Sequence, residues 1–291
     1  MQDSPGKRLK SLIHAPQILV LPGVFDGFST RLVRHAGYTA AFITGSGVSE
    51  SRLGQVDVGL MGLEENVAAA RSMAVCSDLL LLADADTGYG NAVNVYHTVR
   101  AFERAGVAGI MLEDQVWPKR CGHMKGKEVI AAEEMVQKIR AAAAARRSPD
   151  FLLIARTDAR AVEGLDAALD RARRYRDAGA DILFIEAPQT EDEIRAVARA
   201  FPDVPLLFNW AEGGRTPPLP LDRIGEFGFS LVLFPIGTLL AATAGIRSLL
   251  ATLKRDGTPA AALPELPAFA EFTDLIGLPE VQQLEQRFAG G

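Results

Sequence analysis

Cysteine is scarce in this chain, which contains only Cys76 and Cys121 among 291 residues. Two cysteines cannot build the disulfide framework of a small secreted protein, and such low usage is typical of a reducing compartment. The sequence also has no run of about 18 apolar residues that could span a membrane. Its first eight residues contain no apolar core of the signal-peptide type. We therefore expect a soluble cytoplasmic protein without a membrane partner.

Positive charge is not in excess either. The 31 Lys and Arg residues are outnumbered by 36 Asp and Glu residues, and the resulting net charge of −5 argues against nucleic acid as a partner. The hydrophobic share of 48% and the charged share of 23% are ordinary for a globular protein. A chain of 291 residues can bury a large core and has a normal length for one α/β-barrel domain.

What the sequence does contain is a regular alternation of short apolar runs with longer amphipathic stretches. Each run is rich in Leu, Ile, Val or Phe without strict alternation, as expected for parallel strands buried on both faces. The eight predicted strands are residues 18–22, 40–44, 79–83, 109–112, 151–155, 182–185, 205–208 and 231–234. The clearest predicted helices are residues 64–73, 92–105, 132–145, 165–178 and 191–201.

Eight strands separated by helices predict a (β/α)₈ TIM barrel, an α/β fold. An open, doubly wound sheet is the alternative, because the pattern itself does not establish closure. We expect residues 1–291 to form a single barrel domain, with 255–291 as a C-terminal helical extension. Residues 268–288 read as amphipathic helix with a break at 277–279. They exceed what a barrel needs, so a neighbouring subunit is a surface on which they could pack.

Polar side chains follow the predicted strands where βα loops begin, which is where barrel enzymes place their active sites. Asp84 and Asp86 follow the third strand, and residues two apart on a strand point the same way. Two converging carboxylates suit a hard divalent cation such as Mg²⁺, and Glu113 after the next strand favours the same site. The alternative is an ordinary turn, since Asp-Thr-Gly and Tyr-Gly are turn signals.

Residues 119–123 read Lys-Arg-Cys-Gly-His and follow the fourth strand by only a few residues. A thiol beside two cations and an imidazole should ionise more easily than an ordinary cysteine. Cys121 is therefore the first candidate for a nucleophile or a proton-transfer group. The alternatives are a small residue in a loop and a fragment of a zinc site. Zinc needs further soft ligands at short spacing, and the neighbouring sequence has none.

Three further strand ends carry groups that could bind a carboxylate. Arg156 could form a bidentate pair with a substrate carboxylate, or instead an internal salt bridge to Glu186 or Glu113. Asn209 could bind substrate or be a buried structural amide. The stretch 44–47, Thr-Gly-Ser-Gly, could present backbone N–H groups to an anion, although its spacing is not a dinucleotide fingerprint.

Five motifs combine these residues. They are Asp84-Ala85-Asp86-Thr87-Gly88, Leu112-Glu113-Asp114-Gln115, Lys119-Arg120-Cys121-Gly122-His123, Ala155-Arg156-Thr157-Asp158-Ala159 and Glu212-Gly213-Gly214-Arg215-Thr216-Pro217. Together they resemble the isocitrate lyase / phosphoenolpyruvate mutase superfamily, and the resemblance covers roughly residues 8–285. The Lys-Arg-Cys-Gly-His block is similar to that of the carbon–carbon lyase branch. Phosphonate-forming mutases lack it, which argues against phosphonomutase activity.

The resemblance implies a barrel whose last helix is swapped between subunits, in a homotetramer built as a dimer of dimers. It implies Mg²⁺, with Mn²⁺ as the alternative, bound by Asp84 and Asp86 and often through water by Asp57 and Glu113. It further implies that residues 115–128 form a mobile gating loop, which closes over the substrate and delivers the cysteine.

Within the lyase branch, the stretch 115–124 is most similar to 2-alkylmalate and 2,3-dimethylmalate lyases, including petal death protein-like enzymes. Methylisocitrate lyases come second, because they usually have tyrosine where this chain has Phe42. Oxaloacetate-hydrolysing relatives tend to carry serine where this chain has Pro235. We therefore expect a lyase that cleaves a 2-substituted malate, a hydroxy di- or tricarboxylate, to a 2-oxo acid such as pyruvate plus a carboxylate.

Roles follow for the residues named above. We expect Cys121 to be the general acid, with Lys119, Arg120 and His123 stabilising charge nearby. Asp57 and Glu113 are the candidates for the base. The expected substrate-binding residues are Thr44, Gly45, Ser46, Gly122, Arg156, Glu186 and Asn209. Two alternatives stay open at this point: oxaloacetate decarboxylation or hydrolysis with the same metal, and a non-catalytic barrel that senses a dicarboxylate.

Overall fold

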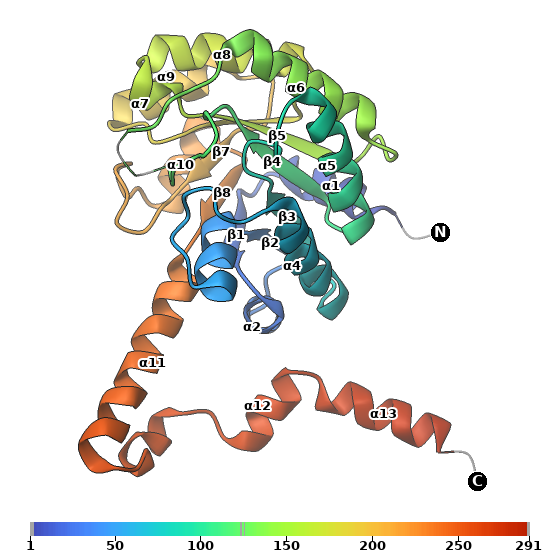
Figure 1. Cartoon of the computed structure of the whole chain (residues 1–291), viewed down its shortest axis with the longest axis vertical. Helices are drawn as coiled ribbons and strands as arrows, with labels where there is room; N and C mark the ends of the chain where they lie inside the picture. The colour runs from blue at the N-terminus through green and yellow to red at the C-terminus, as the bar shows by residue number, and fades with distance from the viewer. Residues whose placement is uncertain (1–2, 123, 125, 290–291) are drawn as a thin grey trace.

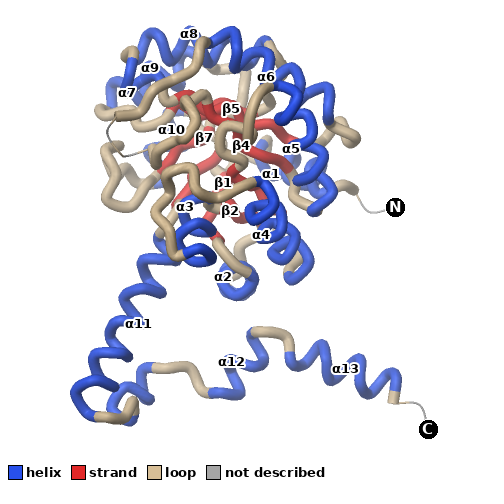
Figure 2. Tube along the Cα trace, in the orientation of Figure 1, coloured by secondary structure: helices blue, strands red, loops and turns tan. Residues whose placement is uncertain are grey.

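Eight parallel strands form one sheet, in the order β6-β5-β4-β3-β2-β1-β8-β7 (Figures 1 and 2). The computed structural model describes residues 3–122, 124 and 126–289. A further parallel bridge joins Leu183 to Leu206, the residue before β7, and closes the sheet into a barrel. The strands are β1 (Leu19–Val24), β2 (Ala40–Ile43), β3 (Leu80–Asp84), β4 (Gly109–Glu113), β5 (Leu152–Thr157), β6 (Ile182–Ile185), β7 (Leu207–Asn209) and β8 (Leu231–Phe234).

The predicted (β/α)₈ barrel is confirmed, and the bridge between β6 and the start of β7 excludes the open sheet. Helices surround the strands (Figure 2). They are α1 (Pro5–Ile13), α2 (Gly27–His35), α3 (Gly45–Val48), α4 (Leu63–Cys76), α5 (Ala92–Ala105), α6 (Ala132–Ala145), α7 (Ala159–Val162), α8 (Leu165–Asp177), α9 (Glu191–Ala200), α10 (Leu221–Phe227) and α11 (Gly237–Asp256). A π-helical turn, η1 (Ser49–Leu53), follows α3, and a 3₁₀ segment, η2 (Ala260–Glu265), follows α11.

The core lies on both faces of the sheet, which explains the unbroken apolar runs in the sequence. In β2, Ala40 and Phe42 face the barrel interior, whereas Ala41 and Ile43 pack toward the helices. The other strands alternate in the same way. Helix α1 closes the N-terminal end of the barrel, where its Leu9 joins the inner cluster. Apolar residues therefore fill the barrel up to the C-terminal ends of the strands, and only that end is left for polar groups.

The C-terminal part of the chain leaves the barrel. Helix α11 runs away from it, and α12 (Phe269–Leu275) and α13 (Leu278–Phe288) pass beneath it as an arm (Figure 1). No residue of these three helices is buried. The arm touches the barrel where Phe272 packs on Phe28 of α2, with ring centroids 5.8 Å apart. Among the residues that the structure describes, no helix is long and apolar enough to cross a membrane.

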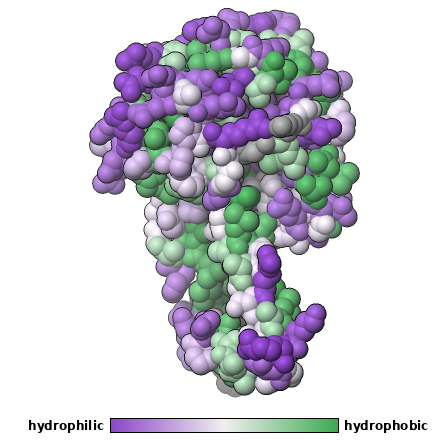
Figure 3. All heavy atoms as spheres, turned by 90° about the vertical axis from the view of Figure 1, so that its left-hand side faces the viewer, coloured by the Kyte–Doolittle hydropathy of each residue, from purple (hydrophilic) through white to green (hydrophobic). Residues whose placement is uncertain are grey.

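Large apolar side chains are exposed along α11 and the arm. Leu250, Phe269, Val281, Leu284 and Phe288 are each at least half exposed. Figure 3 shows apolar residues gathered on the lower part of the molecule, below a more hydrophilic upper barrel. A surface of this kind marks a protein–protein contact. A swapped last barrel helix and a homotetramer both remain predictions.

We expect light scattering at micromolar concentration to give a mass several times 31.2 kDa, with a tetramer as the predicted state. Leu250→Glu combined with Leu284→Glu should shift the protein toward smaller species, because charges would then have to be buried in the contact. Val93→Glu is the control, since this side chain is 67% exposed but lies on α5 of the barrel. A monomer mass for the unmodified protein would contradict the prediction.

Candidate active site

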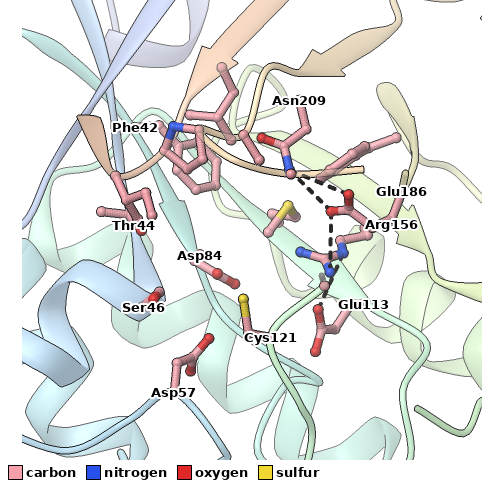
Figure 4. Close-up of a pocket in the computed structure, with 18 of the residues that line it drawn as sticks. Phe42, Thr44, Ser46, Asp57, Asp84, Glu113, Cys121, Arg156, Glu186 and Asn209 are labelled. Atoms are coloured by element: carbon pink, nitrogen blue, oxygen red, sulfur yellow. Dashed lines mark hydrogen bonds and ion pairs between the residues drawn. The ribbon is translucent and has the colours of Figure 1, made fainter. Parts of the chain in front are cut away.

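The alternation of the strands places six polar side chains at the C-terminal end of the barrel. In β3, Leu80 and Leu82 face inward, so the next inward position belongs to Asp84. In β2, β4, β5, β6 and β7, the residue two positions after the last inward apolar residue is also polar. These residues are Thr44, Glu113, Arg156, Glu186 and Asn209. Together they line one cavity of about 160 Å³, whose floor includes Phe42, Met111 and Phe184 (Figure 4). This is smaller than usual for a drug-sized ligand and suits a small organic acid.

One side of the cavity holds what we call the acidic cluster, Asp57, Asp84, Asp86 and Glu113. All four carboxylates are buried. The ammonium of Lys119 reaches into the cluster, 2.6 Å from the Asp57 carboxylate and 2.9 Å from Asp86 Oδ1. The backbone N–H of Asp86 donates to Asp84 Oδ1 over 3.0 Å.

Asp84 and Asp86 come together by a different route from the one predicted. We expected both to lie on one strand and to point the same way, but β3 ends at Asp84. Asp86 lies beyond it in the left-handed region, with φ 48°. This turn, rather than strand alternation, brings Asp86 back beside Asp84 and Lys119. The turn that the sequence analysis gave as the alternative to a metal site is therefore present, and it brings the carboxylates of the cluster together.

Burial makes the ionised carboxylates of the cluster costly. Desolvation, reinforced by the charge of Asp86, raises the pKa of Asp84 to about 6. Desolvation also raises the pKa of Glu113 well above its usual range, although Arg156 and Lys119 oppose it. Burial alone would lower the pKa of Lys119, but Asp86, Asp57 and Glu113 raise it further, so the ammonium stays charged. Negative charge thus exceeds the single ammonium inside the cluster.

The residues of the cluster fit a divalent cation with few protein ligands. No three Asp, Glu, His or Cys side chains in the described part of the chain converge as a complete metal cage. Glu113 Oε1, however, is a buried oxygen without a hydrogen-bond partner there. Mg²⁺ keeps several waters and needs only one or two carboxylates plus substrate oxygens. The surplus negative charge and the open carboxylate oxygen are therefore compatible with Mg²⁺ beside Asp84.

The opposite side of the cavity is built around Arg156. Its Nε lies 2.9 Å from Asp158 Oδ2 and 3.3 Å from Glu113 Oε2, and its Nη2 lies 3.3 Å from Glu186 Oε2. The internal salt bridge that the sequence left open as an alternative is thus present. Asn209 Nδ2 donates to Glu186 over 3.2 Å, while its Oδ1 is buried without a hydrogen-bond partner among the described residues. That amide oxygen can accept a bond from a substrate hydroxyl.

The first part of the loop, residues 115–122, brings Cys121 to the cavity, with Asp57 and Asp84 on one side and Glu113 and Arg156 on the other (Figure 4). Cys121 is half-buried. Gly122 packs so closely that a Cβ there would lie 2.4 Å from Arg156 Nη2. The backbone N–H of Arg120 donates to the Gln115 side chain, which donates back to the Arg120 carbonyl. The loop therefore lies closed over the cavity, and its predicted gating motion stays a prediction.

The remaining predicted residues that the structure describes lie around the same mouth. The Thr44 hydroxyl accepts from the Gly47 N–H and caps α3, and the Ser46 hydroxyl donates to Glu50 over 2.9 Å. Gly45 packs against the Asp84 carboxylate, where a Cβ would lie 2.8 Å from Oδ2. Arg120 lines the cavity but is largely exposed. His123 lies outside the described residues.

Sequence reasoning missed two groups of residues. Lys127 and Asp158 form a buried ion pair behind Arg156. Asp158 stands two residues after Arg156, the same spacing as Asp84 and Asp86, so this signal was available. The second group belongs to the apolar wall of the cavity, which comprises Phe42, Met111, Phe184, Leu233, Pro235 and Ile236. The resemblance had singled out only Phe42 and Pro235, and no motif marked the other four.

A barrel that presents buried carboxylates, an arginine and a thiol to a small closed cavity is an enzyme framework for small carboxylic acids. Comparison with known proteins narrows this class. The chain belongs to the phosphoenolpyruvate phosphomutase family, whose profile matches residues 9–254. The resemblance to the isocitrate lyase / phosphoenolpyruvate mutase superfamily is thereby confirmed.

Curated relatives include lyases. The chain is 43% identical over 284 residues to 2,3-dimethylmalate lyase of Eubacterium barkeri, covering 98% of each chain. It is 45% identical over 249 residues to a probable 2-methylisocitrate lyase of Corynebacterium glutamicum, covering 86% of this chain and 81% of the relative. The chain is accordingly a carbon–carbon lyase.

Solved structures agree on the fold. A 2,3-dimethylmalate lyase superposes with a TM-score of 0.94 at 36% identity, covering 100% of this chain and 97% of that one. An oxaloacetate acetylhydrolase bound to 3,3-difluorooxaloacetate also gives 0.94, at 35% identity over 99% and 98% of the two chains. A phosphonopyruvate hydrolase in complex with oxalate and Mg²⁺ gives 0.90 at 28% identity, covering 99% and 100%.

We expect Asp84→Asn to weaken the binding of Mg²⁺, measured by calorimetry with the metal alone, on the order of 10-fold or more because a charged ligand is lost. Asp78→Asn is the control, since Asp78 pairs with Arg34 on the surface. Equal Mg²⁺ affinity in Asp84→Asn and the unmodified protein would exclude Asp84 as a ligand.

Asp84 should also make the free energy of unfolding of the metal-free protein depend on pH. Its raised pKa means that ionisation destabilises the folded state, a penalty absent below the usual value of 3.8 and complete above about 6. With chelator present, the free energy of unfolding of Asp84→Asn relative to the unmodified protein should therefore rise between these pH values and then level off. Urea unfolding at several pH values measures this. A difference independent of pH would show that Asp84 does not titrate in this range.

Proposed function

We propose that this lyase cleaves a 2-substituted malate to a 2-oxo acid such as pyruvate plus a carboxylate. The observation that carries the proposal is Cys121, which the closed loop holds between the acidic cluster and the Arg156 side of the cavity. The names of the relatives, a 2,3-dimethylmalate lyase and a probable 2-methylisocitrate lyase, support the same substrate class.

The acidic cluster would receive the hydroxyl end of the substrate. Asp84 and Asp86 would hold Mg²⁺, with Mn²⁺ as the alternative, while Asp57 and Glu113 take part through water. When bound, the metal would act as a Lewis acid on the 2-hydroxyl and on the carbonyl that forms from it. Asp57 and Glu113 are the two carboxylates of this chain that could accept the hydroxyl proton. Phe42, which faces the same cavity, carries no group that could do so.

The Arg156 side would hold the substrate carboxylates. Gly122, Arg156 and Asn209 line this part of the cavity, and Glu186 orients the last two. The backbone N–H groups at 44–46, which lie beside Asp84, would bind a carboxylate from the other side. Nε and Nη2 of Arg156 already pair with carboxylates of the chain among the described residues. A substrate carboxylate would therefore join an existing ion-pair network, and the buried Asn209 oxygen would gain its missing donor.

Cys121 would act after the C2–C3 bond breaks. The electron pair of that bond moves onto C3 as an enediolate-like carbanion, and the thiol donates its proton there. We expected Lys119, Arg120 and His123 to stabilise charge near the thiol. The Lys119 ammonium is engaged by Asp57 and Asp86, so its contribution would be to balance the acidic cluster.

The apolar wall favours an alkyl substituent on the substrate. Leu233, Pro235 and Ile236 meet on one side of the cavity and offer no side-chain donor to a further polar group. An alkyl group there would be removed from water, at about 0.8 kcal/mol per buried CH₂. Oxaloacetate hydrolysis is the second candidate, because an oxaloacetate acetylhydrolase has the same fold with a TM-score of 0.94.

We expect Cys121→Ser to lose most of the turnover of a 2-alkylmalate with Mg²⁺, by roughly 10²–10⁴-fold, because a serine hydroxyl is a far poorer acid than a thiol. Cys76→Ser is the matched control, since Cys76 lies at the end of α4, away from the cavity. Full turnover in Cys121→Ser would remove the general-acid role.

The substrate class can be tested with a panel of malate derivatives, assayed for 2-oxo acid release. We expect 2-alkylmalates and 2,3-dimethylmalate to be cleaved more efficiently than malate, because the apolar wall binds the alkyl group. Oxaloacetate should be a poor substrate. Efficient turnover of oxaloacetate together with no cleavage of any 2-alkylmalate would replace the lyase proposal with the second candidate.

A further inference from the structure

Lys127 is a buried lysine at the far end of the loop 115–128. Its ammonium lies 2.5 Å from Asp158 Oδ1 and 2.5 Å from the Gly122 carbonyl oxygen. The side chains of Lys127 and Asp158 are 3% and 0% exposed. A lysine in a surface loop normally keeps its charge in water, since burial is unfavourable unless the charge is paired. The buried ammonium of Lys127 lies between the loop and the barrel, and the reaction proposed above assigns it no role.

The partners of Lys127 lead directly to the Arg156 side of the cavity. Asp158 Oδ1 accepts both from Lys127 and from Arg156 Nη2, which lies 3.1 Å away. The Asp158 backbone N–H donates to the Asp114 carboxylate over 2.9 Å, so the backbone of Asp158 is held against the end of β4. Burial would raise the pKa of Asp158, but Arg156 and Lys127 outweigh it and keep this carboxylate ionised. The Asp158 carboxylate is thus ionised at neutral pH.

The other bond of Lys127 holds the loop where the site needs it. Gly122 is the neighbour of Cys121, and it approaches Arg156 and Glu186 too closely for any side chain. Lys127 binds the carbonyl of this same glycine. A second anchor lies on the other side of the thiol, where Lys119 reaches Asp57 and Asp86. The segment that carries Cys121 is therefore fastened by one lysine to each side of the cavity.

We propose that Lys127 is a positioning residue, which sets the place of the Cys121 thiol by linking the Gly122 carbonyl to Asp158. Lys127 does not line the cavity. This inference rests on the proposed role of Cys121. A displaced thiol would still allow substrate to bind, because the acidic cluster and Arg156 remain, but it would reach C3 less often. The effect should therefore fall on kcat more than on KM.

The test compares Lys127→Met with Arg146→Met in a Cys76→Ser background, where Cys121 is the only thiol left. Arg146 is the matched control, because it also binds both a carboxylate, Asp181 at 2.7 Å, and a backbone carbonyl, but lies away from the cavity. Two readouts are needed: steady-state kinetics on a 2-alkylmalate, and the rate at which iodoacetamide alkylates Cys121 without substrate.

We expect Lys127→Met to lower kcat by roughly 10- to 100-fold, with KM changed less than about threefold. It should also speed alkylation of Cys121, because the loop is released. Lys127→Gln, which keeps a donor for the Gly122 carbonyl, should lie between Lys127→Met and the parent. Arg146→Met should lower the melting temperature while leaving kcat and the alkylation rate unchanged.

Parent-like kcat and alkylation in folded Lys127→Met would overturn the inference. If that variant does not fold, the same result in Lys127→Gln would overturn it. An equal loss of kcat and an equal rise of the alkylation rate in Arg146→Met would also overturn the inference, since they would indicate a general effect of lost stability. Failure of the proposed function would give different results: either Cys121→Ser would retain turnover, or the unmodified protein would cleave no 2-alkylmalate. The alkylation rates would then still decide whether Lys127 holds the loop.

Discussion

The structure depends on burying several carboxylates at one end of a barrel whose remainder is apolar. Six of them are buried: Asp57, Asp84, Asp86, Glu113, Asp158 and Glu186. Such a concentration of buried negative charge is stable only with cations among it, and the chain supplies Lys119, Lys127 and Arg156. Two of these three cations belong to the loop over the cavity. The same loop residues therefore both cover the cavity and balance its charge.

This balance is incomplete on the side of the acidic cluster. The pKa of Asp84 is raised to about 6, and Glu113 keeps an oxygen without a hydrogen bond among the described residues. On the Arg156 side, by contrast, Asp158 has its pKa lowered by Arg156 and Lys127 despite burial. The cavity thus has one end that would gain from a further cation and another that is already neutralised. A metal-bound hydroxy acid fits this polarity.

The period-two alternation of the strands made much of the site predictable. The eight apolar runs gave the barrel, and the inward positions that follow Leu82, Met111, Ile154 and Phe184 are Asp84, Glu113, Arg156 and Glu186. Asp86 lies beside Asp84 as expected, but strand alternation does not put it there. Its position depends on a left-handed backbone conformation after β3, which strand alternation does not describe.

Contacts between distant loops were beyond sequence reasoning. Lys119 meets Asp57 across 62 residues and Lys127 meets Asp158 across 31, and no local pattern pairs such residues. The internal pairing of Arg156 was visible only as an alternative. The course of α11 and the arm was not predictable either, because no residue of these helices is buried and no core pattern fixes their direction.

A crystal structure of the protein grown with Mg²⁺ and pyruvate tests the central claim most directly. We expect a cation beside Asp84 and Asp86, pyruvate bound to it through its 2-oxo group, and the methyl group of pyruvate against the apolar wall. The sulfur of Cys121 should lie on the face of the pyruvate C2 carbon from which C3 of the other product departs. Density for both ligands only outside this cavity, or a pyruvate whose methyl group points away from the apolar wall with Cys121 on the opposite face of C2, would contradict the account.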